Sequence, residues 1–424
     1  MIGRRFIEAN ELPARADVAI IGGGPAGAAA AWAIERAAPG TQIVLLEQSG
    51  SLGAGASLAS LENFRTCWPA PCLARMMQRS VSAFLNPAAD LGENTALGVR
   101  QQGYLYVAFD EKGAQTLRRD VLHLHNIGLS HVEYLDMGEV AYRYPWLGER
   151  VMAAKFDPLA GWLDSHALIY AFANCTRAAR FVLGVRGACI RLAGGRVAGI
   201  ITDSGAIDTP NVVIAAGANA RQVGRSAGIE IPVEARPRQS FTTPWRHAAF
   251  PEDAPCIISA APFPHVRPEA RTGAIFGWEY GGVHRLAAPE QPAESFNDAR
   301  FPSLTLALLA RQFGHRDGVG FADPRYLRDI SHRAGYYVCR SNAYTTLPDG
   351  TRQPYESQRA IIDAWPGVYG LFLSVAHVGH GVMSSPAAGE ILAAKVLGRA
   401  LPDPVYADFG LNVPYVEYDA GGLH

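Results

Sequence analysis

The chain has 424 residues, of which 49% are hydrophobic and 18% charged, so it is long enough to bury a large core and to form two domains. Its formal net charge of −1 gives no field that would attract nucleic acid or an anionic membrane surface, and we expect neither as a partner. Nearly all cationic side chains are arginine, because lysine occurs only at positions 112, 155 and 395.

The cysteines predict a reduced protein without a metal site. They lie at positions 67, 72, 175, 189, 256 and 339, without C-x-x-C pairs or metal-ligand spacing. The uncharged stretch from 18 to 34 is shorter than a bilayer requires and is interrupted by Gly-Gly-Gly-Pro, so we expect no transmembrane segment and no targeting segment. These patterns favour a cytoplasmic location.

The first predicted unit of structure runs from Asp17 to Glu47, after an N-terminal extension of residues 1–15. An apolar run enters a G-x-G-x-x-G turn, an Ala-rich helix follows, and a second apolar run ends on an acidic residue. This is the pattern of a dinucleotide-binding βαβ unit. Gly22 permits the tight turn, Gly24 lets backbone N–H groups approach a pyrophosphate, and Gly27 lets helix and sheet pack closely. Glu47, twenty residues after Gly27, is placed to accept hydrogen bonds from a ribose and disfavours the 2′-phosphate of NADP.

Further elements follow from the hydrophobic periods. We expect a helix over 69–85, a strand over 103–108, a helix over 114–128, a capped helix beginning after Asp164, and a hairpin over 196–206. The section from about 232 to 324 is richer in proline and aromatic residues, and we interpret it as the core of a second domain. Chain crossings between the domains are therefore expected near residues 95, 160, 230 and 325.

Three segments join the N-terminal motif to a known family. They are the small-residue loop after Glu47, the buried strand that ends at Ala216-Gly217, and the C-terminal Gly379-His380-Gly381. In this order they resemble the D-amino-acid oxidase and sarcosine oxidase superfamily of FAD-dependent amine oxidoreductases. The resemblance implies an α/β fold, in which a Rossmann-like FAD-binding domain (16–95, 160–230 and 325–400) is interleaved with an antiparallel-sheet substrate-binding domain (96–159 and 231–324).

The resemblance also implies which residues bind the cofactor. FAD, bound non-covalently, is expected at Gly22, Gly24, Pro25, Ala26, Gly27, Glu47, Gln48, Gly55, Ala56, Ser57, Ala216, Gly217, Gly379, His380, Gly381, Val382 and Met383. Cys339 lies upstream of Pro348-Asp349-Gly350, as does the cysteine that bonds the flavin in monomeric sarcosine oxidases. Three extra residues intervene here, which disfavours a covalent bond.

Four residues are candidates for catalytic work. Arg65 stands where sarcosine-oxidase-like enzymes bind the substrate carboxylate, a task that suits a planar guanidinium. His380 could relay a proton or contact FAD through its backbone alone. His265 replaces a family tyrosine, and is either a polar contact or acid/base group at the substrate, or a solvated loop residue. Tyr337 stands where the D-amino-acid branch carries an arginine. Four aromatic residues either form one wall of the substrate site or simply belong to the core. They are Trp68, Trp278, Tyr280 and Tyr337.

The resemblance implies oxidation of the C–N bond of an amino acid or N-substituted amino acid, by hydride transfer to flavin N5 and hydrolysis of the imine. A 2-hydroxy-acid oxidoreductase, a non-catalytic flavoprotein and a subunit of a hetero-oligomeric dehydrogenase remain as alternatives. Sarcosine-type oxidases keep lysines at the flavin, and none occurs here between Lys155 and Lys395. This favours a dehydrogenase that passes electrons to a quinone or a carrier protein. A homo-oligomer is also compatible with the sequence.

Overall fold

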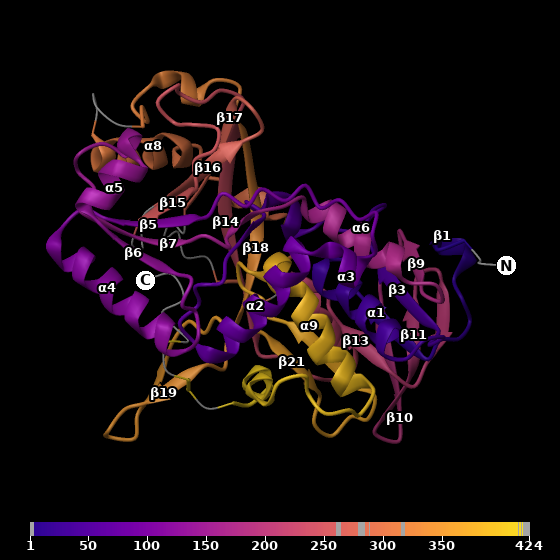
Figure 1. Cartoon of the computed structure of the whole chain (residues 1–424). Helices are drawn as coiled ribbons and strands as arrows, with labels where there is room; N and C mark the ends of the chain where they lie inside the picture. The colour runs from indigo at the N-terminus through magenta and orange to yellow at the C-terminus, as the bar shows by residue number, and fades with distance from the viewer. Residues whose placement is uncertain are drawn as a thin grey trace.

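The computed structural model describes residues 4–259, 264–278, 285–287, 289–314, 319–413, 415–416 and 418. Two large sheets lie side by side, and each has its own group of helices (Figure 1). Helices α1, α3, α6 and α9 gather at the first sheet, whereas α4, α5 and α8 lie at the second. Their bounds are α1 Pro25–Ala37, α2 Pro71–Leu85, α3 Pro87–Leu91, α4 Glu111–Asn126, α5 Met137–Arg143, α6 Ser165–Cys175, α7 Ala220–Ser226, α8 Phe301–Phe313 and α9 Gly381–Val396.

The first sheet is parallel except at one edge. In spatial order it contains β1 (Phe6–Glu8), β9 (Arg180–Leu183), β3 (Ile43–Glu47), β2 (Val18–Ile21), β13 (Val212–Ile214), β22 (Leu371–Val375) and β21 (Ile361–Ala364). Only β21 runs antiparallel to its neighbour. The predicted βαβ unit is confirmed as β2–α1–β3, and β1 shows that part of the N-terminal extension lies at the sheet edge.

Alternate residues of the first sheet face two different layers. Val18 and Ile20 pack on α1, α2, α6 and α9, whereas Ala19 and Ile21 face a small antiparallel sheet. That sheet contains β10 (Cys189–Ala193), β11 (Arg196–Thr202) and β12 (Gly205–Asp208), so the predicted hairpin is confirmed. The strands of a doubly covered parallel sheet are expected to be apolar on both faces, as these are.

The second sheet is built from both expected substrate-domain segments and one more. In spatial order it contains β18 (Ser331–Arg340), β14 (Val233–Thr243), β17 (Gly273–Trp278), β16 (His265–Glu269), β15 (Cys256–Ser259), β5 (Tyr104–Ala108), β7 (Ala153–Asp157) and β6 (Glu133–Asp136). It is antiparallel except where β15 and β5 pair in parallel. The chain leaves this sheet after Arg340, later than the expected crossing near 325, because β18 pairs along most of β14.

Smaller elements complete the chain. Strands β4 (Asn63–Phe64) and β8 (Gly161–Trp162) pair with each other, as do β19 (Tyr344–Thr346) and β20 (Arg352–Pro354). The helices expected over 69–85 and 114–128 are confirmed as α2 and α4, and Asp164 caps α6 by accepting from the N–H of Ala167. In the part of the chain described above, every helix is too short or too polar to cross a bilayer.

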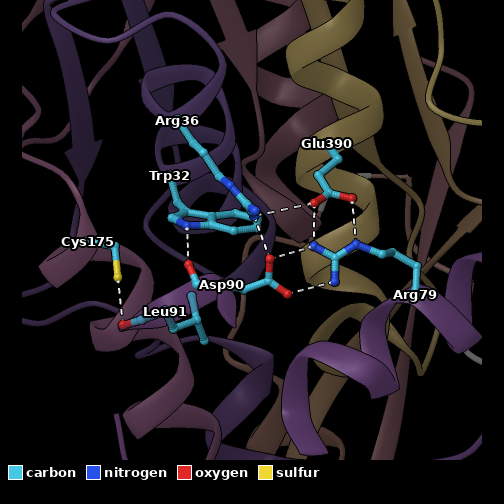
Figure 2. Close-up of polar contacts among 7 residues, drawn as sticks. All are labelled: Trp32, Arg36, Arg79, Asp90, Leu91, Cys175 and Glu390. Carbon is cyan, nitrogen blue, oxygen red and sulfur yellow. Dashed lines mark hydrogen bonds and ion pairs between the residues drawn. The ribbon is translucent and has the colours of Figure 1, made fainter. Parts of the chain in front are cut away.

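A network of arginines and carboxylates ties helices α1, α2, α3 and α9 of the first domain together (Figure 2). Arg79 on α2 donates to Asp90 on α3 at 2.8 Å and 3.0 Å, and its Nε donates to Glu390 on α9 at 3.0 Å. Arg36 on α1 donates to the same Asp90 at 2.6 Å. Burial alone would raise the pKa of Asp90, but the hydrogen bonds from Arg79 and Arg36 lower it below its usual value.

Candidate functional site

A cavity of about 1060 Å³ is lined by residues from both sheets. Its walls from the first domain are the segments that follow β2, β3, β13 and β22, which are 22–26, 47–49, 215–219 and 376–379. Its walls from the second sheet are 238–240, His265, 277–278 and 334–338. Ligands of open α/β sheets bind outside the carboxyl ends of parallel strands, and these four segments all lie there.

The three glycines of the first turn differ in what surrounds them. A Cβ on Gly22, which has φ +114°, would lie 2.3 Å from the carbonyl oxygen of Ala215. A Cβ on Gly27 would lie 1.9 Å from the carbonyl oxygen of Gly22, so both positions require glycine for packing. A Cβ on Gly24 would meet nothing within 4 Å, which leaves open space beside the N-terminus of α1. That space, next to free helix N–H groups, suits a pyrophosphate.

The carboxylate of Glu47, at the end of β3, is fixed against the same turn. Its Oε2 accepts from the N–H of Gly23 and its Oε1 from the N–H of Ser49, both at 2.8 Å. Glu47 lines the cavity. An ionised carboxylate accepts about four hydrogen bonds, so this one retains capacity for the hydroxyls of a ribose.

The other expected cofactor residues lie at the cavity with three exceptions. Gly27 packs against the first turn, as its predicted role requires. Met383 is buried in the core. It follows the cavity-lining Val382 on a helix, where the side chains of consecutive residues point about 100° apart around the helix axis. The side chain of His380 is also buried, and its Nε2 donates to the carbonyl oxygen of Gln358 at 2.6 Å. Gly379 and Gly381 on either side of it line the cavity.

The segment before Gly379 has a strained backbone. Ala376 has φ +59° and Val378 has φ +49°, in the left-handed region that a β-branched residue rarely adopts. The N–H of Val378 donates to the carbonyl oxygen of Val338 on β18 at 2.9 Å, which fixes the segment against the second sheet. Strain of this kind costs about 1–3 kcal/mol per residue and persists where neighbouring structure enforces it, often at functional sites.

His265 and Tyr337 both lie on the cavity wall. His265 is paired across strands with Gly277, and Tyr337 lies against the backbone of Gly379, where a Cβ would be 2.5 Å from its Cζ. The guanidinium of Arg238 lies over the Tyr337 ring, 5.4 Å from its centroid. Trp278 lines the cavity as expected, Trp68 does not, and Tyr280 lies outside the described residues.

Arg65 is buried and does not belong to the described lining of the cavity. Its guanidinium lies 4.1 Å from the ring centroid of Trp68 and 5.7 Å from that of Tyr104. The next two residues are held by the buried Asp157, which accepts from the N–H groups of Thr66 at 2.6 Å and Cys67 at 3.0 Å. The lining of the cavity therefore includes His265 and Tyr337, whereas Arg65 and His380 are buried and do not belong to it.

Both histidines that line the cavity are held neutral. Burial, and then the positive charge of Arg65, lower the pKa of His265 from 6.5 to about 4. Burial, and then the charge of His380, lower the pKa of His377 from 6.5 to about 3. A neutral imidazole keeps one nitrogen as a hydrogen-bond acceptor.

The three lysines lie away from the cavity walls described above. Lys112 is exposed on α4, Lys395 donates to Asp363 at 2.6 Å, and Lys155 donates to Asp120 at 3.2 Å. Lys155 also lies 4.4 Å from the ring centroid of Tyr106. The described walls contain two arginines instead, Arg186 and Arg238.

A family model described as FAD dependent oxidoreductase matches residues 17–395. The chain belongs to this family. It is 24% identical over 402 residues to a glycine oxidase of Geobacillus kaustophilus, covering 89% of this chain and 92% of that protein. It is 25% identical to a sarcosine oxidase subunit beta of Rhizobium meliloti, covering 70% and 73% respectively. The structure of an L-proline dehydrogenase from P. horikoshii has the same fold, with a TM-score of 0.76, 21% identity, and coverage of 94% of this chain and 98% of that one.

For an FAD-dependent oxidoreductase, the residues present fit the cofactor. The open cradle at Gly24 and the fixed carboxylate of Glu47 match a pyrophosphate and a ribose. Several residues that line the cavity were not predicted from the sequence. They are residues 185–189, Gln222, Arg238, Gly277, residues 289–294 and His377. The only signal for most of them was a glycine or proline in an otherwise ordinary strand or loop.

Proposed function

We propose that this FAD-dependent oxidoreductase oxidises the C–N bond of an amino acid or an N-substituted amino acid. The observation that carries the proposal is one continuous cavity whose walls include both the glycine turn of the first domain and His265, Tyr337 and Arg238 of the second sheet. The relatives named glycine oxidase and sarcosine oxidase subunit beta support this substrate class.

The side chains of the second sheet would prepare the substrate. Bound FAD supplies the hydride acceptor. His265, held neutral, would accept a hydrogen bond from the N–H of the substrate amine, which must be unprotonated to give up a hydride from the adjacent carbon. Tyr337 and Trp278 would exclude water and limit the orientations of the substrate. Arg65 would act through His265, whose pKa its charge lowers.

We expect FAD to be bound without a covalent bond. Cys339 is 1% exposed and lies outside the described cavity wall, although its neighbour Val338 belongs to it. Burial raises the pKa of its thiol to about 12, which keeps the sulfur protonated and poorly nucleophilic. Denaturation in acid should therefore release all of the FAD into the supernatant.

The proposal is tested by reduction of the bound FAD without oxygen. The purified holoprotein would be mixed anaerobically with amino acids, N-methyl amino acids, opines and 2-hydroxy acids while the flavin absorbance is followed. Bleaching by an amino acid or N-substituted amino acid, with formation of a 2-oxo acid or an aldehyde, is the expected result. If only 2-hydroxy acids bleach the flavin, the protein is instead a 2-hydroxy-acid oxidoreductase. Tight FAD that no small substrate bleaches would indicate a non-catalytic flavoprotein or an isolated subunit.

A further inference from the structure

We propose that Arg238 is the residue that binds the carboxylate of the substrate. This inference rests on the proposed function, because it names the group that would recognise an amino acid in the cavity. It differs from the expectation for Arg65, whose guanidinium is packed on Trp68 and which does not belong to the described lining of the cavity. Arg238 lies on β14 and lines the cavity itself.

Arg238 is unusual among the partly or fully buried arginines of the second sheet. Arg236, two residues earlier on β14, pairs with Glu234 and Glu356. Arg267 pairs with Glu269 and also donates to the carbonyl oxygen of Leu61. Guanidinium groups in protein interiors normally have such partners.

Within the described part of the chain, Arg238 has no carboxylate partner. Its Nη1 makes one long contact, 3.4 Å to the carbonyl oxygen of the preceding Pro237. Its Nε is inaccessible to solvent and has no hydrogen-bond acceptor among the described residues. A guanidinium has five N–H donors in a planar fork, which matches the two oxygens of a carboxylate. Arg238 therefore retains the donors that an anionic ligand requires.

The position of this guanidinium is fixed by the residues around it. It lies over the ring of Tyr337, 5.4 Å from the centroid. That ring packs on the backbone of Gly379, where a Cβ would be 2.6 Å from the tyrosine Oη. Gly379 begins the segment that leads into α9. Arg238 is thus held where the second sheet meets the C-terminal cofactor segment.

The other cationic groups near the cavity are poorly placed for this task. Arg186 is exposed, on the loop after β9, which ends beside the Glu47 strand. The described cavity wall contains no lysine. His265 and His377 carry no charge at neutral pH, because burial lowers the pKa of both. Among the described residues, Arg238 is therefore the side chain of the second-sheet wall that stays positively charged at neutral pH.

The inference is tested by a binding measurement on the holoprotein. The flavin spectrum would be titrated with propionate, a carboxylate without an amine, and with the uncharged propionamide, at constant ionic strength. We expect a saturable change with propionate and none with propionamide. Arg238→Met should weaken propionate binding by about tenfold to a hundredfold, and Arg238→Lys by less, because an ammonium keeps the charge and loses the fork. Arg271→Met is the control, because Arg271 is exposed in the turn between β16 and β17 and does not line the described cavity, and this variant should bind propionate like the wild type.

The outcomes separate this inference from the proposed function. The assignment would be overturned if Arg238→Met bound propionate with the affinity of the wild type. If the Met variant does not retain FAD, Arg238→Gln takes its place in this test. The assignment would also be overturned if propionate did not change the flavin spectrum of the wild-type protein. If amino acids reduce the FAD equally well in wild type and Arg238→Met, the function stands and the assignment falls. If propionate binding depends on Arg238 but no amino acid reduces the FAD, the carboxylate site stands and the proposed function falls.

Discussion

The imidazole of His265 fills the space that a side chain at Gly277 would need. The two residues are directly opposite each other on β16 and β17, and a Cβ on Gly277 would lie 2.4 Å from His265 Nε2. Cross-strand neighbours on one face of a sheet pack against each other, so a glycine here lets the ring lie flat across its partner strand. Gly277 therefore positions His265 on the cavity wall.

Gly277→Ala should displace His265 and slow reduction of the bound FAD. We expect the variant to retain FAD, because the nucleotide-binding turn is in the other domain, and to lose about tenfold or more in the rate of flavin reduction, because misplaced catalytic groups are costly. Stopped-flow absorbance measures this rate directly. The nearby tip of Leu61, 2.9 Å from the same Cβ, is at the end of a side chain and can move.

A double variant distinguishes displacement of His265 from general damage. In a His265→Ala background the clash with the imidazole is absent, so adding Gly277→Ala should cause little further loss. If the two substitutions instead slow reduction additively, Gly277 does not act through His265.

Arg65→Met should shift the pH dependence of flavin reduction. The pKa of His265 is lowered from 6.5 to about 4, first by burial and then by the charge of Arg65, so the imidazole is neutral at all pH values above about 4. Loss of that charge raises the pKa of His265 toward its usual value. The rate should then begin to fall at a higher pH on acidification than in the wild type, because protonated His265 no longer accepts a hydrogen bond from the substrate amine. Arg65→Lys, which keeps the charge, should retain most of the wild-type profile, and an unchanged profile in Arg65→Met would exclude this coupling.

Two glycines of the first turn should have different phenotypes. Gly24→Val places a side chain in the open space at the N-terminus of α1, so we expect folded protein without FAD. Gly27→Ala places a Cβ 1.9 Å from the carbonyl oxygen of Gly22 and should reduce the yield of folded protein itself. Circular dichroism and the ratio of flavin to protein absorbance separate the two effects. Stoichiometric FAD in Gly24→Val would contradict the assignment of the cradle.

The nucleotide end of the site could be predicted because its determinants are local. Gly22, Gly24, Gly27 and Glu47 lie within one βαβ unit, where spacing along the chain fixes the distance in space. The family resemblance supplied the loop after β3 and the Gly379–Gly381 segment.

The substrate end could not be predicted in the same way. The position of the Arg238 guanidinium depends on Tyr337, which lies about a hundred residues later on another strand. The sequence around neither residue indicates that the two are in contact. The direction of the His380 side chain is decided by a carbonyl oxygen on Gln358, outside the Gly-His-Gly motif. Arg65 fits the family motif, yet its guanidinium packs on Trp68 and Tyr104 from two separate segments and Arg65 does not line the described cavity.

Arg79→Met should destabilise the first domain more than Arg36→Met does. Arg79 is hydrogen-bonded to both Asp90 and Glu390 and is 27% exposed, whereas Arg36 is 47% exposed (Figure 2). Loss of Arg79 removes hydrogen bonds to both carboxylates and leaves only the more exposed Arg36 between them, for a cost of about 1–3 kcal/mol, against about 0–1 kcal/mol for loss of Arg36. The apparent melting temperatures of the two holoprotein variants, compared with wild type, measure the difference. Melting temperatures equal to that of the wild type in both variants would show that this network does not stabilise the fold, and equal losses would contradict the larger role of Arg79.

The last prediction concerns the electron acceptor of the reduced protein. A positive charge beside reduced flavin favours superoxide formation, and the described cavity walls contain no lysine. His265 and His377 do not replace it, because the pKa values of about 4 and about 3 keep both neutral. Arg238 is the cation that remains on the second-sheet wall, and bound substrate or product would neutralise it. We therefore expect anaerobically reduced protein, mixed in a stopped-flow instrument with air-saturated buffer, to reoxidise little faster than free reduced flavin. A soluble quinone analogue should reoxidise it rapidly, as for a dehydrogenase. Rapid oxygen consumption with stoichiometric hydrogen peroxide would instead identify an oxidase, and comparison with Arg238→Met would then show whether this arginine supplies the charge.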